Sequence, residues 1–193
     1  QLEGLSRDDF SEVFLFFDYD VHQKNLGKAD DGDVINQMLE SFDNETENGK
    51  LYISYPMVEA LRDFEAGKCG NGDNCFVEIS DLAEYKNISS RNSLNPHFRD
   101  YNIDVWKEIV DVFSMKISCL LGNAEVISYE QYLDEANPHD IFMCEQALAG
   151  NNKVFIISAF PEFLVDYFGM KLWRTCVKHA KNQLDICNCR ESR

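Results

Sequence analysis

The sequence predicts an all-α protein of two lobes, in which paired helix–loop–helix units make short β contacts between their loops. Three segments support this fold class, because in each a polar turn leads to apolar residues, a serine and then an apolar helix start. These segments are 48–56, 124–133 and 151–161. We expect the serines to cap the helices that follow them.

The spacing of these segments is the second observation. Leu26 and Leu51 stand 25 positions apart, and Ile127 and Val154 stand 27 apart. Leu26 precedes Ile127 by 101 positions, so the two pairs repeat along the chain. Because the backbone of a β residue needs a partner strand, we expect Leu26 to pair with Leu51 and Ile127 with Val154.

Residues 6–66 form the first predicted pair of units. Residues 10–17 are predicted as an amphipathic helix, because their apolar side chains recur at helical spacing. We expect further helices over 33–42 and 57–64, the latter with Pro56 in its first turn.

Residues 101–170 form the second predicted pair, and residues 67–100 form a polar, turn-rich connector. A glycine, Gly169, is expected to end a helix before a C-terminal helix and tail over 171–193. The helices predicted for the second pair cover residues 103–115, 140–148 and 161–168.

Composition excludes several function classes. The chain has 193 residues, 45% of them hydrophobic and 27% charged, so it can build a core. The formal net charge of −16 argues against nucleic acid and against anionic membranes as partners. No apolar run reaches the roughly 18 residues of a membrane span, so none is expected.

The cysteines and two glycosylation sequons favour a secreted protein. Cys69 and Cys75 enclose a polar loop, and we expect a disulfide between them. Asn44 and Asn87 each begin an Asn-x-Ser/Thr sequon. Seven cysteines is an odd number, so one thiol is left over or joins two chains in a dimer. The pairing of the others stays open: Cys119, Cys144, Cys176, Cys187 and Cys189.

With these helix–loop–helix spacings and exit segments, residues 6–170 resemble a degenerate four-EF-hand protein. The similarity is to the group of sarcoplasmic calcium-binding proteins, calcium-regulated photoproteins and coelenterazine-binding proteins. The resemblance implies calcium as a cofactor. Its loops depart from the pattern, because His22 stands at the fifth loop position and a closing bidentate glutamate is missing.

The calcium candidates lie in the first two loops. Acidic residues occur there at alternate positions, as oxygen ligands do in such loops: Asp18, Asp20, Asp43, Glu45 and Glu47. Because the ligand sets are incomplete, we expect calcium binding to be weak or lost.

An apolar small molecule is the alternative ligand, because two facing lobes rich in aromatic residues can enclose a cavity. The expected polar-tipped lining residues are Trp106, Tyr132, Trp173 and His179. The competing interpretation is that these side chains only fill the core.

Catalysis has little support in the sequence, which lacks paired metal-spaced histidines, a nucleophile elbow and a phosphate-binding loop. We therefore expect a secreted, non-enzymatic binding protein with an extracellular partner. The alternatives are a carrier or luminescent protein holding a coelenterazine-like molecule, and an acidic calcium- or mineral-associated protein.

Overall fold

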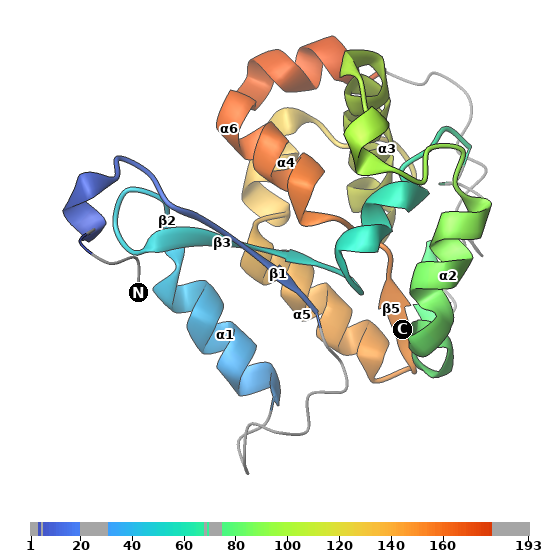
Figure 1. Ribbon diagram of the computed structural model, residues 1–193, viewed down its shortest axis with the longest axis horizontal. Helices are drawn as coiled ribbons and strands as arrows, with labels where there is room; N and C mark the ends of the chain where they lie inside the picture. The colour runs from blue at the N-terminus through green and yellow to red at the C-terminus, as the bar shows by residue number, and fades with distance from the viewer. Residues whose placement is uncertain (1–3, 5, 20–30, 68, 70–74, 179–193) are drawn as a thin grey trace.

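The computed structural model describes residues 4, 6–19, 31–67, 69 and 75–178 (Figure 1). The all-α prediction is wrong, because the described residues are 58% helical and 14% strand and include two small sheets. The α-helices are α1 (Asp31–Ser41), α2 (Leu82–Asn92), α3 (Ile103–Leu120), α4 (Tyr129–Glu135), α5 (Pro138–Ala149) and α6 (Ala159–Cys176). The strands are β1 (Phe14–Asp18), β2 (Asp43–Asn44), β3 (Gly49–Ser54), β4 (Phe76–Glu78) and β5 (Lys153–Phe155). Short 3₁₀ helices are η1 (Arg7–Asp9), η2 (Val58–Asp63), η3 (Ile79–Asp81) and η4 (Phe98–Asp100).

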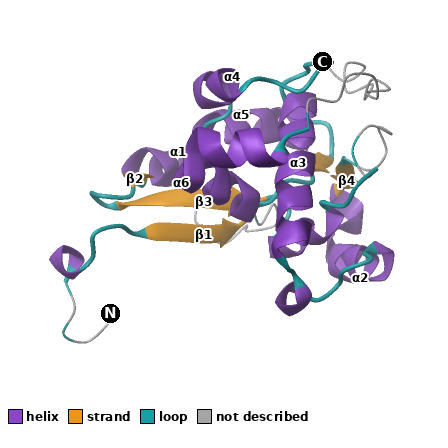
Figure 2. Cartoon of the chain, turned by 90° about the horizontal axis from the view of Figure 1, so that it is seen from above, coloured by secondary structure: helices purple, strands orange, loops and turns teal. Residues whose placement is uncertain are grey.

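The larger sheet has the strand order β1-β3-β2. Strand β1 runs parallel to β3, with Phe14 opposite Lys50 and Asp18 opposite Ser54 (Figures 1 and 2). The helix predicted over 10–17 is therefore wrong. Residues 14–17 are apolar at every position, so they satisfy a strand as well as a helix, and their phenylalanines favour the strand.

Strand β3 has helices on both of its faces. Its Lys50 and Tyr52 side chains reach Asp166 of α6. The pleat turns Leu51 and Ile53 to the opposite face, toward α1 and α5, which also contact β3. Strand β3 is consequently buried and serves as the platform on which α6 rests.

The smaller sheet joins the predicted connector, residues 67–100, to the predicted second pair, residues 101–170. Val77 of β4 pairs with Val154 of β5, and Tyr55 forms an isolated antiparallel bridge with Ile157. The expected pairing of Ile127 with Val154 is therefore wrong; the Ile127 backbone N–H donates instead to Ser118 Oγ at 3.0 Å. The other expected pairing involves Leu26, which lies outside the described residues.

Two of the predicted serine caps are confirmed. Ser128 forms a capping box with Gln131 at the start of α4, and Ser158 Oγ accepts from the Phe160 backbone N–H at the start of α6. Ser54 does not cap the segment that follows it; its hydroxyl accepts from the backbone N–H of Ala159, the first residue of α6, at 3.2 Å. The helix expected over 57–64 is instead the 3₁₀ helix η2.

As predicted, Gly169 ends a helix: α6 consists of two helices that meet at a kink at this residue. Its φ of 64° and ψ of −155° are left-handed values that strain any other residue. A Cβ at this position would lie 3.5 Å from Tyr129 Oη. The last turns of α6, as far as Cys176, therefore take a new direction after Phe168.

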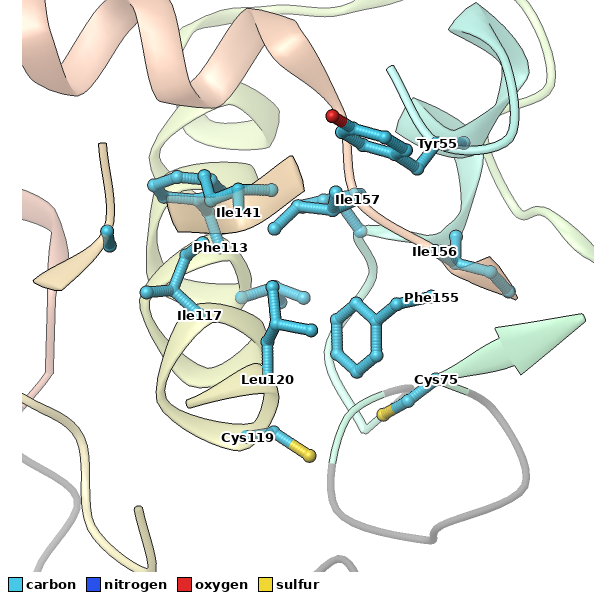
Figure 3. Packing of buried hydrophobic residues seen from close by; sticks show 14 of the residues in the cluster. Tyr55, Cys75, Phe113, Ile117, Cys119, Leu120, Ile141, Phe155, Ile156 and Ile157 are labelled. Atoms are coloured by element: carbon cyan, nitrogen blue, oxygen red, sulfur yellow. The ribbon is translucent and has the colours of Figure 1, made fainter. Parts of the chain in front are cut away.

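One hydrophobic core connects the α-helices with β1, β3, β4 and β5, and Figure 3 shows part of it. Phe113, Phe142 and Phe155 are completely buried in it. The predicted disulfide stabilisation is wrong, because no two sulfurs of the described cysteines lie at bonding distance. Cys69 Sγ and Cys75 Sγ are 3.9 Å apart, compared with about 2.05 Å in a disulfide.

Candidate functional site

An apolar cavity of about 340 Å³ lies between α3 and α6. Its lining residues recur every three or four positions on each helix, so each helix presents one face to it. From α3 these residues are Ile103, Trp106, Lys107 and Val110. From α6 they are Phe160, Phe163, Leu164, Phe168, Leu172 and Cys176.

Local sequence signals fix the start of both helices beside the cavity. Asn102 Oδ1 accepts from the backbone N–H groups of Asp104 and Val105 at 2.9 and 3.0 Å, so α3 begins at its first lining residue, Ile103. Ser158 caps α6 two residues before Phe160. The walls are therefore held by capped helices, of which α6 is kinked at Gly169. The volume falls within the range of about 300–1,000 Å³ that is typical of small-molecule pockets.

Strand β1 supports the wall of the cavity that α6 forms. The Phe16 ring stacks on Phe160 with centroids 5.0 Å apart, and the Phe14 ring meets Phe163 edge-on at 4.8 Å. On the other helix, Trp106 packs edge-on against Tyr101 at 5.7 Å. These contacts hold the rings at fixed angles, which favours a preformed site.

The cavity is open to solvent on the side where its lining is most exposed. Ile103 is 67% and Phe168 55% exposed, although both are large apolar residues. Lys107 brings a charge to the lining, and its Nζ lies 3.3 Å from Asp104 Oδ1. An apolar ligand would cover side chains that water now contacts, which is the driving force for binding.

The opposite face of α6 carries a polar cluster centred on Asp166. Asp166 Oδ2 accepts from Lys50 Nζ at 2.5 Å and from Tyr52 Oη at 3.0 Å, and Asp166 Oδ1 accepts from Tyr132 Oη at 2.8 Å. Glu162 lies one turn earlier on α6, and its Oε1 is buried without a hydrogen-bond partner. We name these five residues the Asp166 cluster.

Burial dominates the electrostatics of the Asp166 cluster. It raises the pKa of Glu162 well above the ordinary value, the Asp166 charge raises it further, and Lys50 opposes both. Burial and the Asp166 charge also raise the pKa of Tyr132, which keeps its phenol protonated as a donor. None of the five residues lines the cavity, so the cluster joins α6 to β3 and α4 instead of facing a ligand.

The structure does not bring the predicted calcium ligands into one site. Within residues 6–19, 31–67, 69 and 75–178, no group of three histidine, cysteine or acidic side chains is arranged to hold a metal ion. Asp18 ends β1, and burial raises the pKa of its carboxyl group. Asp43 is exposed in β2, Glu45 and Glu47 follow in the next turn, and Asp20 lies outside the described residues. Calcium binding stays a prediction.

Backbone carbonyls of the turn that follows β2 bind an arginine. Arg7 donates to the carbonyl oxygens of Glu45, at 2.9 Å, and of Glu47. The same guanidinium donates to the Phe10 carbonyl. Arg7 thus supplies the positive charge to a loop in which the sequence had suggested a metal.

Of the predicted cavity residues, Trp106 lines the cavity between α3 and α6. Tyr132 and Trp173 pack on each other instead, with centroids 5.3 Å apart, and His179 lies outside the described residues. The α6 lining was not predicted. Its signal was present, because apolar residues recur at helical spacing from Phe160 to Leu172.

The predicted glycosylation sites occupy different settings. Asn44 is half-buried in β2, and its Oδ1 accepts from Thr46 N at 2.9 Å and Thr46 Oγ1 at 2.7 Å. Asn87 is exposed on α2, and its Nδ2 donates to Glu84 Oε2 at 3.1 Å. Glycosylation and secretion stay predictions.

Among the residues that the structure describes, no helix has both the length and the apolar character needed to cross a membrane. Comparisons with protein-family models, curated proteins and solved structures find no match to this chain. The function is therefore inferred from the geometry of the molecule.

Proposed function

We propose that the protein binds an uncharged, apolar small molecule in the cavity between α3 and α6. The cavity itself carries this proposal: it has about 340 Å³ of space, walls that are almost entirely apolar, and two capped helices to hold it. The excess of acidic residues disfavours anionic ligands over neutral ones. Weak calcium binding and an extracellular partner rest on the sequence alone.

The shape of the lining indicates what kind of molecule fits. Aromatic rings of Trp106, Phe160 and Phe163 surround the space, so flat ring systems and branched hydrocarbons can pack against their faces. Almost no polar group faces inward to orient a polar ligand. Selectivity would therefore come from size and shape, with Lys107 available to one polar substituent of the ligand.

Titration with N-phenyl-1-naphthylamine, an uncharged dye that fluoresces in apolar surroundings, tests the proposal. We expect one saturable site with a dissociation constant of about 1–100 μM, as suits a ligand of this size. In Leu164→Trp the larger side chain fills the cavity, and the affinity should fall by about 100-fold.

Leu133→Trp is the matched control, because Leu133 is exposed on α4 and does not line the cavity. It should bind the dye as the unmodified protein does. Fluorescence that rises without saturation, or equal affinity in Leu164→Trp and Leu133→Trp, contradicts the proposal.

A further inference from the structure

Three thiols meet beside β4, two from the segment that precedes this strand and one from α3. Cys69 Sγ lies 3.9 Å from Cys75 Sγ, and the Cys69 side chain also forms a hydrogen bond with Cys119 of α3. Figure 3 shows the sulfur atoms of Cys75 and Cys119 pointing toward each other. The sulfurs of Cys69 and Cys75 therefore need only a small movement to form a disulfide.

The three thiols differ in their access to solvent. Cys75 is completely buried and Cys119 is 5% exposed, whereas Cys69 is partly exposed. A small reagent in solution thus reaches Cys69 first. The two buried thiols are placed to react with Cys69 once the reagent has modified it.

A buried lysine lies within electrostatic reach of the thiols. Lys116 precedes Cys119 by one turn of α3, is completely buried, and its Nζ has no hydrogen-bond partner. Its Nζ lies over the rings of Phe64 and Phe155, 5.3 and 5.6 Å from their centroids. The positive charge of Lys116 favours the thiolate form of Cys69.

We propose that Cys69, Cys75 and Cys119 form a thiol–disulfide exchange centre that reacts with low-molecular-weight disulfides, with Cys69 as the entry thiol. This centre is independent of the apolar cavity. It differs from a fixed Cys69–Cys75 disulfide, because Cys69 has two alternative partners.

The exchange proceeds in two steps, and in each step one S–S bond forms while another breaks. The Cys69 thiolate attacks one sulfur of a disulfide RSSR, forms a mixed disulfide and releases one RS⁻. The Cys75 thiolate then attacks the Cys69 sulfur, forms the Cys69–Cys75 disulfide and releases the second RS⁻. The protons of the two protein thiols pass to the two leaving groups, so one RSSR becomes two RSH. Cys119 replaces Cys75 in the second step when it attacks first.

The reaction should be slow at neutral pH. The hydrogen bond with Cys119 lowers the pKa of Cys69, but the hydrogen bond with Cys75 and burial outweigh it and raise this pKa to about 12. Below that value the thiolate fraction grows about tenfold with each pH unit, and so should the rate of the first step.

The test treats the reduced protein with oxidised glutathione at pH 8, 9 and 10 and maps the disulfides by mass spectrometry. Cys187 and Cys189 are first replaced by serine, so that only the described cysteines compete. We expect a Cys69–Cys75 disulfide, and a Cys69–Cys119 disulfide in Cys75→Ser. Lys116→Met should slow the first step several-fold at each pH.

Cys144→Ser is the control, since Cys144 is not in the thiol cluster, and it should leave the products and rates unchanged. A glutathione adduct that persists on Cys69 overturns the proposal, and so does a Cys69 that stays reduced at pH 10. Both outcomes can be read in the protein that keeps Cys75 and Cys119, so the test does not depend on a variant that folds poorly.

Discussion

Replacing Asp166 by alanine is expected to lower the free energy of unfolding by about 3–5 kcal/mol. The substitution removes the acceptor of three hydrogen bonds at once, from Lys50, Tyr52 and Tyr132. Tyr52 and Tyr132 are buried, so their hydroxyls cannot find water instead. Urea denaturation followed by circular dichroism measures the loss.

The exposed ion pair between Arg99 and Asp100 provides the control. Its atoms are 3.7 Å apart and both side chains are largely exposed, so Asp100→Ala should cost less than about 0.5 kcal/mol. Asp166→Asn, which keeps the shape of the side chain, should fall between the two. An Asp166→Ala protein as stable as Asp100→Ala would show that the Asp166 cluster does not hold α6 to β3.

Replacing Glu162 by glutamine is expected to stabilise the protein at neutral pH by about 1–3 kcal/mol, because a neutral amide replaces a buried carboxyl group that must take up a proton on folding and whose Oε1 has no hydrogen-bond partner. The pKa of Glu162 is raised in the folded state, mainly by burial. The folded protein therefore holds this proton more tightly than the unfolded chain does. Its contribution to stability is complete below the unfolded pKa, near 4.5, and is lost as pH rises toward the folded pKa.

The difference in stability between Glu162→Gln and the unmodified protein should consequently be small at pH 4 and grow toward pH 8. Thermal unfolding across this range measures it. Glu130→Gln is the control, and its effect on stability should change with pH in the opposite direction. Hydrogen bonds lower the pKa of the exposed Glu130 at the start of α4. A difference for Glu162→Gln that stays constant with pH would contradict a buried, protonated Glu162.

Features set by local sequence were predicted well. Ser128 and Ser158 cap the helices that they precede, and α3 and α5 occur where apolar residues recur at helical spacing. In each case the signal and the structure lie within a few residues of each other, so the outcome depends little on distant parts of the chain.

Features set by distant contacts were not predicted. The apolar pattern of residues 14–17 fits both a helix and a strand, and pairing with β3 decides for the strand. The Asp166 cluster shows the same limit. Glu162 and Asp166 stand one turn apart in the sequence, but Lys50 and Tyr52 precede Asp166 by more than a hundred positions.

The candidate site was predicted only in part, for a related reason. An aromatic residue in a sequence does not show whether it fills a core or lines a cavity. Trp173 packs in the core, 3% exposed, whereas Trp106 lines the space between α3 and α6. Which of the two occurs depends on how two helices that are far apart in the sequence pack against each other.

The two tryptophans provide the most direct test of the proposed ligand site. In Trp173→Phe the remaining tryptophan is Trp106 of the cavity, and in Trp106→Phe it is Trp173 of the core. The measurement is quenching of tryptophan fluorescence by 1-bromonaphthalene, an uncharged apolar compound with a heavy atom. We expect saturable quenching in Trp173→Phe and none in Trp106→Phe. Absence of saturable quenching in Trp173→Phe would contradict a ligand site between α3 and α6.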